Sequence, residues 1–182
     1  MIKINKIIYS KRKTLCIEIN KYGEIIARSP KNLSIDDIQK FVNEKSNWIY
    51  KQLHHRKNCI LKAQQFLSKN KTNISKSVAY KTISNKVSQL SSTFGFKYNI
   101  IKITEAKTRW ASCSNTNNLS FTKKVALLPD DILKYIIIHE LAHTKEKNHG
   151  KNFWKIVQQI IPNYKTKIKW LKEHKYILIS DL

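Results

Sequence analysis

The first part of the chain alternates apolar and polar positions with a period of two, a pattern typical of β-strands. Within residues 2 to 30 the alternation is interrupted by the turn residues Lys21-Tyr22-Gly23-Glu24. We therefore expect a β-hairpin here, with residues 2 to 9 extending it. The alternating apolar positions of its first arm are Leu15, Ile17 and Ile19.

Two later segments change to the helical period. Ser34 is expected to open the first helix, with Asp36 and Asp37 in its first turn. Its predicted buried stripe consists of Ile38, Phe41, Val42, Trp48, Ile49 and Leu53. The second helix is predicted from about Ser75 to Phe94, with Gly95 as its C-terminal stop. Its predicted inward positions are Val78, Ile83, Val87, Leu90 and Phe94.

The residues between these two helices are polar and rich in lysine, which indicates a connector. We predict an N-terminal lobe of hairpin and helix over residues 1–56, a connector over 57–73 and a core over 74–182. A single compact domain is the alternative, because 182 residues are enough for one.

Strand and helix patterns alternate in the C-terminal half. Pro129-Asp130-Asp131 precedes a strongly apolar run, which indicates the start of a buried helix. The predicted strands are residues 98–104, 109–114 and 119–122. The helices predicted after the apolar run are residues 151–161, ended by Pro162, and 163–174.

The apolar run leads into His139-Glu140-Leu141-Ala142-His143. On a helix, His139 and His143 lie one turn apart and face the same way, so both can bind one Zn²⁺ with Glu140 beside it. His149, six residues on, can supply a third ligand. Three protein ligands leave a position open for water, and Glu140 is then placed to accept its proton. The spacing predicts a hydrolytic zinc site.

Two other interpretations fit the same histidines. A solvated helix face can carry them incidentally, although their position after the apolar run speaks against this. A structural zinc site is the second, but such sites usually close the fourth position with cysteine, and the chain has no Cys-x-x-Cys pair.

Composition adds a strong positive charge. The chain has 35 Lys plus Arg against 12 Asp plus Glu, a formal net charge of +23. This charge predicts non-specific, salt-sensitive binding to nucleic acid, but the lysines are scattered and do not form one block. The three cysteines are widely spaced and the apolar runs are too short to span a membrane, so we expect a cytoplasmic protein with no membrane partner. Nothing in the pattern indicates an oligomeric state.

Several motifs together resemble the YgjP-like family of predicted zinc-dependent metallopeptidases, which is related to the SprT and WLM groups. They are Ser10-Lys11-Arg12-Lys13-Thr14, Lys45-Ser46-Asn47-Trp48-Ile49, Arg109-Trp110-Ala111-Ser112-Cys113-Ser114, His139-Glu140-Leu141-Ala142-His143, and Asn148-His149-Gly150 followed by Phe153-Trp154. The last three are the most specific, and the resemblance spans nearly the whole chain.

The resemblance implies that His139, His143 and His149 bind zinc and that Glu140 is the general base. It implies an α+β, zincin-like core, with a small antiparallel sheet packed on the zinc helix and an edge strand bordering the cleft. The family commonly has Gly where Ala111 stands, so a methyl group is added at that point.

The residues around Trp110 have two interpretations. As the cleft edge, Arg109 and Ser112 would contact substrate, with Arg109 holding an oxyanion or a carboxylate. As a core strand, Trp110 would pack beneath the zinc helix and Cys113 would be a small buried residue. Cys113 is disfavoured as a nucleophile or a zinc ligand, because the three histidines already supply the three protein ligands of the metal. Phe153 and Trp154 are expected to fix the loop of His149. Glu146 is a candidate to hold a ligand histidine, with an exposed side chain as the alternative.

The leading functional hypothesis is a zinc-dependent hydrolase, most simply a metallopeptidase acting on peptides or proteins. One alternative is hydrolysis of a nucleotide phosphoanhydride, a small anionic substrate, although the chain has no Gly-rich phosphate loop. Further alternatives are a DNA-associated, SprT-like protein and a non-catalytic zinc-binding module.

Overall fold

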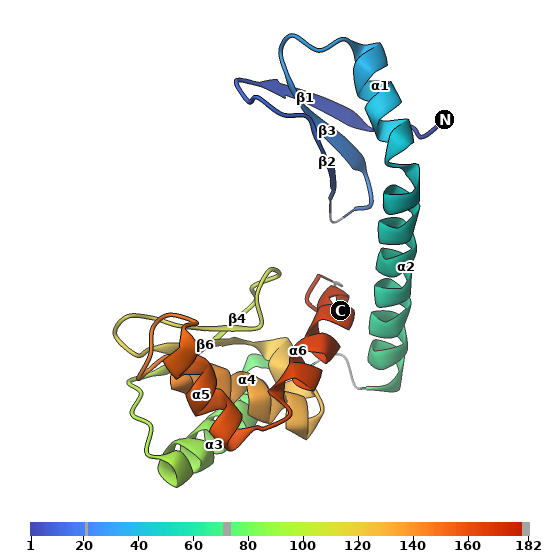
Figure 1. The fold of residues 1–182 in the computed structure, drawn as a ribbon. Coiled ribbons are helices and arrows are strands. Elements are labelled where there is room, and N and C mark those ends of the chain that lie inside the picture. Colours follow the sequence, from blue (N-terminus) through green and yellow to red (C-terminus); the bar gives the residue numbers. More distant parts are fainter. Residues whose placement is uncertain (21, 71–73, 180–182) are drawn as a thin grey trace. The chain divides into compact units, whose positions relative to one another are not determined.

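The computed structural model describes residues 1–20, 22–70 and 74–179, which form an α+β fold (Figure 1). Its strands are β1 (Lys6–Ser10), β2 (Cys16–Ile19), β3 (Ile25–Pro30), β4 (Ile101–Thr104), β5 (Ala111–Cys113) and β6 (Leu119–Thr122). Its α-helices are α1 (Ile35–Glu44), α2 (Ser46–Lys69), α3 (Lys76–Phe94), α4 (Asp130–Ala142), α5 (Lys151–Ile160) and α6 (Tyr164–Glu173). Short 3₁₀ helices are η1 (Lys123–Leu127) and η2 (Lys175–Ile177). The chain divides into two compact units, Met1–Ile60 and Leu61–Leu182.

The first unit contains a three-stranded sheet with the order β1-β3-β2. β2 and β3 form the predicted antiparallel hairpin, but β1 joins β3 in parallel, so the sheet is mixed. Of the predicted turn residues, Lys21 lies outside the described part of the chain. The unit's core is built from Ile2, Ile25, Val42 and Ile49, with Ile4, Ile17, Ile19 and Leu53 packed against it.

The helix predicted to begin after Ser34 starts as expected but is divided in two. Ser34 caps α1 by accepting a hydrogen bond from the backbone N–H of Asp37, 3.1 Å away. The helical path breaks at Lys45, and α2 then continues to Lys69. Trp48, predicted to be buried, is 44% exposed. That prediction was wrong because the break at Lys45 ends the regular stripe of α1, and in α2 it is the neighbouring Ile49 that is buried.

Most of the segment predicted to be a connector is therefore helical. Its polar residues face solvent, while Cys59, Ala63 and Leu67 recur every four residues and are buried. The sparse stripe of small and apolar residues explains why the composition indicated a linker. Residues 71–73 of the segment lie outside the described residues, and the predicted domain boundaries stay a prediction.

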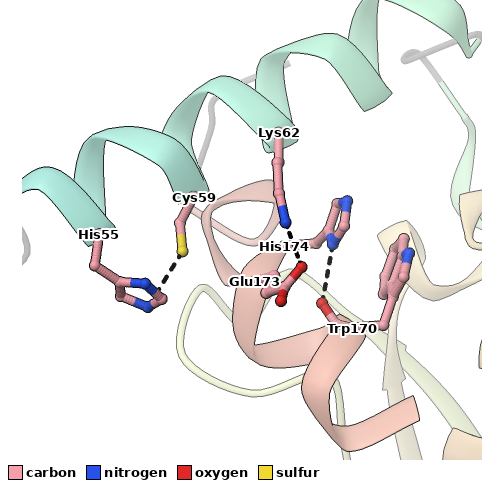
Figure 2. Close-up of polar contacts among 6 residues, drawn as sticks. All are labelled: His55, Cys59, Lys62, Trp170, Glu173 and His174. Carbon is pink, nitrogen blue, oxygen red and sulfur yellow. Dashed lines mark hydrogen bonds and ion pairs between the residues drawn. The ribbon is translucent and has the colours of Figure 1, made fainter. Parts of the chain in front are cut away.

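Within the second unit, the end of α2 packs against α6, and Figure 2 shows Lys62 of α2 beside Glu173, Trp170 and His174. Trp170 and His174 stack with ring centroids 3.9 Å apart, and the Nδ1 of His174 lies 2.9 Å from the carbonyl oxygen of Trp170. Phe66 presents its edge to Trp170 at 5.8 Å. An ion pair between Lys62 and Glu173 closes the same contact. These groups attach α6, which flanks α4, to the rest of the unit.

The second sheet has the order β4-β6-β5. The prediction of an antiparallel sheet was wrong in one respect, because β4 pairs with β6 in parallel and only β5 pairs with it antiparallel. The long connection between β4 and β6, which includes β5, allows the parallel pairing. Ser112 lies opposite Ser120 in the β5–β6 register.

Helix α4 is the central element of the second unit and contacts α3, α5, α6 and β5. It begins at Asp130, as the Pro129-Asp130-Asp131 pattern predicted, and most of its residues are buried. A helix that is apolar on nearly every face must be surrounded on nearly every face. Ion pairs tie its first turn to the neighbouring helices, from Lys86 to Asp130 at 2.7 Å and from Lys167 to Asp131 at 2.5 Å.

Helix α3 spans its predicted residues, but two predicted inward positions are not buried, and of these Phe94 is partly buried. Ile83, Val87 and Leu90 are buried, but Val78 is 54% exposed. The stripe continues one turn before Ile83 through Ala79 instead, and Val78 is rotated about 100° away from that line. Among the described helices, none is both long and apolar enough to cross a membrane.

Gly95 provides a test of the stop signal after α3. Its backbone is left-handed, with φ +64°, and a Cβ there would meet nothing within 4 Å. Gly95→Ala should lower the free energy of unfolding by about 1 kcal/mol through backbone conformation alone. Gly150→Ala is the matched control, since a Cβ there also meets nothing but φ is −76°. Its expected change is within about 0.5 kcal/mol. Urea denaturation of both variants without metal measures the difference, and equal effects would contradict the explanation.

Candidate functional site

Three histidines converge at the C-terminal end of α4. His139 lies in the last turn of the helix, His143 is its C-cap, and His149 lies in the irregular segment before α5. The Nε2 atom of His149 is 3.0 Å from that of His139 and 3.2 Å from that of His143. All three of the histidines singled out from the sequence are therefore brought to one point.

The spacing of these nitrogen atoms fits one metal ion. Zn–N bonds are about 2.0–2.1 Å long, so two ligands at tetrahedral positions are separated by about 3.3 Å. The two Nε2 separations are close to this value, and the ligand atoms of all three residues lie within 4.8 Å of one another. The group can hold a metal ion.

The other nitrogen of two of these rings has a partner. The Nδ1 of His143 lies 3.0 Å from the backbone carbonyl oxygen of Glu146, to which it can donate only as the Nδ1–H tautomer. The Nε2 lone pair then points toward the cluster. The backbone of Glu146, and not the carboxylate considered in the sequence analysis, makes this contact. The Nδ1 of His139 is 3.4 Å from the hydroxyl of Tyr135, one helical turn earlier.

Tyr135 was not identified from the sequence as part of the site. Burial raises the pKa of its hydroxyl to about 12, so the group keeps its proton. The signal available was its spacing of four residues from His139, which places both side chains on one helix face. In a run of apolar residues, that spacing is equally typical of a core tyrosine.

Phe153 forms an apolar floor beneath the histidines. It is completely buried, and its ring centroid lies 4.9, 4.4 and 4.7 Å from those of His139, His143 and His149. The ring of Trp154 also lies beside His139 and His149. The expectation that these two residues fix the loop of His149 agrees with this packing.

The surroundings keep two of the imidazoles neutral. Burial, followed by the charges of His143 and His149, lowers the pKa of His139 to about 3. Burial also lowers the pKa of His143. A histidine binds metal only in its neutral form, so at neutral pH these two rings need lose no proton to do so.

Glu140 is a buried carboxyl group next to this cluster. Its residue is 6% exposed, and burial raises its pKa to about 7. It opens onto a hollow of about 250 Å³ beside the histidines. The hollow is lined by Arg109, Trp110, Ala111, Tyr135, Ile136, His139, Glu140 and Leu171.

The structure places Arg109 at the rim of this hollow, exposed to solvent. Ser112 lies on β5 next to the hollow, partly buried and opposite Ser120. Trp110 is partly buried and lines the hollow. Cys113 is partly buried, and burial raises the pKa of its thiol, which disfavours the reactive thiolate form.

A second hollow of about 780 Å³ lies along α5 and includes His149. The rings of Trp154 and Tyr164 stack there with centroids 5.0 Å apart. The other lining residues are Gly150, Lys151, Lys155, Gln158 and Gln159. This groove was not identified from the sequence. Its signal was the i, i+3, i+4 spacing of Lys151, Trp154 and Lys155 on one face of α5.

The chain is similar to several known proteins. A 36-residue stretch is 44% identical to the UTP pyrophosphatase of Escherichia coli (strain K12). That stretch covers 20% of this chain and 22% of the relative's own length. Two solved structures are metallopeptidase zymogens. Abylysin of Pyrococcus abyssi is 22% identical with a TM-score of 0.46, and the match covers 50% of this chain and 93% of abylysin. Jannalysin of Methanocaldococcus jannaschii is 30% identical with a TM-score of 0.43, covering 48% and 94%.

A family model matches a longer part of the chain. Residues 59–174, well over half of the chain, match the model described as "YgjP-like, metallopeptidase domain". The matched range includes the three converging histidines, the buried Glu140 and the whole of β4, β5 and β6. The resemblance is thereby confirmed for the motifs from Arg109 onward, while the motifs before residue 59 lie outside the match. The chain belongs to the YgjP-like family, through the metallopeptidase domain that residues 59–174 match.

Proposed function

We propose that this protein is a zinc-dependent peptidase in which His139, His143 and His149 hold the metal and Glu140 is the general base. The observation that carries the proposal is the convergence of three Nε2 atoms beside a buried carboxyl group. A set of three imidazole ligands with a free position suits zinc in a hydrolytic site. The three free cysteines are compatible with the reducing cytoplasm expected from the sequence.

A metal ion held by three histidines supplies a Lewis acid that polarises the bond to be cleaved and makes a water molecule more acidic. Tyr135 and the carbonyl of Glu146 hold His139 and His143 in the orientation that aims Nε2 at the ion. Phe153 excludes water from beneath the three rings. These residues therefore fix the orientation of the ligand histidines.

Glu140 then moves the proton. Burial alone places its pKa near 7, and a neighbouring cation lowers it, so the carboxylate is ionised when it is needed. It accepts a proton from the attacking water and donates it to the leaving amine nitrogen. For the second transfer the protonated carboxyl is the form that donates.

The arrangement around β5 favours an extended peptide as substrate. Among the described strands, β5 pairs only with β6, so its other edge keeps free backbone groups. This edge strand contacts α4, and Ala111 borders the hollow that contains Glu140. Arg109 at the rim supplies a positive charge for a substrate carboxylate or an oxyanion. Ser112 is the candidate for a further contact along the strand.

A second candidate is hydrolysis of a nucleotide phosphoanhydride. The short similarity to a UTP pyrophosphatase favours it, as does the groove along α5. There Lys151 and Lys155 suit phosphate oxygens, and the stacked Trp154 offers a surface for a base. The same metal and base would serve, with a phosphorus atom in place of the carbonyl carbon.

Assays against two substrate panels distinguish the candidates. Zinc-loaded protein should cleave members of a mixed peptide library, detected by mass spectrometry, and release no pyrophosphate or phosphate from nucleoside triphosphates. The variant Lys151→Gln/Lys155→Gln should keep most peptidase activity. Nucleotide hydrolysis without peptide cleavage, lost in this double variant, would replace the first candidate by the second.

Replacement of the general base tests the mechanism for either substrate. Glu140→Gln preserves the size of the side chain but cannot accept the proton, so turnover should fall about 10²- to 10⁴-fold. The zinc content, measured by inductively coupled plasma mass spectrometry, should be unchanged. An activity close to that of the unaltered protein would refute the role of Glu140.

Removal of the third ligand tests the metal site itself. His149→Ala should weaken zinc binding by more than about 100-fold, because even residues that only orient a ligand are worth 10- to 100-fold. His54→Ala, at an exposed histidine of α2, is the control and should bind zinc like the unaltered protein. Competition with a chromogenic chelator gives both affinities. Equal affinities in the two variants would exclude His149 as a ligand.

A further inference from the structure

The third histidine lies on the least regular part of the site. Residues 143–150 form turns and bends between α4 and α5, and His149 is exposed at the end of this segment. Backbone hydrogen bonds hold the first half, where Lys145 and Glu146 both donate to the carbonyl of Ala142. Near His149 the backbone bond from Gly150 to Asn148 spans only two residues. Backbone bonds alone leave this end of the loop weakly attached.

The side chain of Lys147, which belongs to the loop, attaches it to residues outside the loop. Its Nζ donates to the carbonyl oxygen of Ser114 at 2.9 Å and to the Oδ1 of Asn117 at 2.5 Å. The Sγ of Cys113 lies 3.9 Å away. These partners are 30 to 34 residues distant in the chain, and they belong to the end of β5 and the turn that follows it.

The turn that receives Lys147 is itself well fixed. The backbone N–H of Asn117 donates to the carbonyl of Ser114 at 3.0 Å, and that of Asn118 donates to the Oγ of Ser114 at 3.0 Å. Asn117 has a left-handed backbone, with φ 58°, a conformation that asparagine tolerates better than most residues. The ammonium group thus binds oxygen atoms whose positions are set by the turn.

The charge of Lys147 is unfavourable for a metal site. The residue lies two positions from His149 and four from His143, and the groups to which it donates on the turn after β5 are neutral. A positive charge near a bound dication lowers its affinity by Coulomb repulsion. A favourable effect of Lys147 on metal binding would have to outweigh this repulsion. Holding the loop of His149 in place is such an effect.

We propose that Lys147 is a positioning residue, which fastens the loop of His149 to the turn after β5 and so holds the third imidazole against the other two. This inference rests on the proposed metal site. It also connects the edge strand, where a substrate would lie, to a ligand of the metal.

The sign of a change in metal affinity tests the proposal. Lys147→Met removes the charge and the hydrogen bonds but keeps the aliphatic length. Repulsion alone predicts tighter zinc binding in this variant, whereas loss of positioning predicts binding weaker by on the order of tenfold. Lys151→Met is the matched control, because Lys151 also lies two residues from His149 but on α5. We expect its zinc affinity to be unchanged or slightly higher. Affinity in Lys147→Met that equals or exceeds that of the control would overturn the proposal.

Three further measurements separate positioning from a general loss of structure. The urea midpoint of metal-free Lys147→Met should match that of the unaltered protein within error. Its cobalt-substituted form should show an altered visible absorption spectrum, which reports the coordination geometry. Lys147→Arg, which retains the donors, should recover most of the zinc affinity.

Asn117→Gly removes the receiving amide while glycine keeps the left-handed backbone. It should weaken zinc binding in the same direction as Lys147→Met, and the two effects should not add. Full additivity, or an unchanged cobalt spectrum in Lys147→Met, would refute the attachment. If the unaltered protein bound no zinc, both this inference and the proposed function would fail. If the unaltered protein bound zinc through His149 but Lys147→Met had the same zinc affinity, only this inference would fail and the proposed function would stand.

Discussion

Three imidazole rings packed around one buried phenyl ring are the interaction on which the site depends. Phe153 has no exposed surface and contacts His139, His143 and His149, so the histidines rest on a hydrocarbon floor. Burial against this apolar ring disfavours protonated imidazole. The packing also fixes the positions of the three rings and therefore of their Nε2 atoms. The beginning of α5 is thus as much a part of the site as the end of α4, although it contributes no ligand itself.

The burial of α4 sets the chemistry at its end. Because the helix is surrounded by α3, α5, α6 and β5, the last turn emerges from a low-dielectric interior. His139 and Glu140 are neighbours in sequence, and the same burial moves their pKa values in opposite directions, down for the imidazole and up for the carboxyl. Both shifts favour neutral forms. The cation that the histidines are arranged to hold would restore the negative charge of Glu140, which couples the base to the metal.

The sequence was sufficient for features governed by local rules. The start of α4 at Asp130, the stop of α3 at Gly95 and the convergence of His139 with His143 follow from capping, backbone conformation and helical spacing. Features that depend on distant partners could not be predicted in this way. The parallel pairing of β4 with β6, the burial of Cys59 within a polar helix and the role of Tyr135 are decided by tertiary contacts. Lys147 looks like any exposed lysine until the turn at Asn117 is placed beside it.

The two outer strands of the second sheet differ in what they allow to pair with them. β4 carries Lys102, an exposed charge in the middle of its edge, and such lysines discourage sheets of separate molecules from joining. β5 has only Ala111, Ser112 and Cys113, with no charge and no bulk. An edge of three residues is too short to recruit another sheet and start aggregation. The short length of β5 thus disfavours self-association of the protein through this edge, while the strand can still pair with a few residues of an extended peptide.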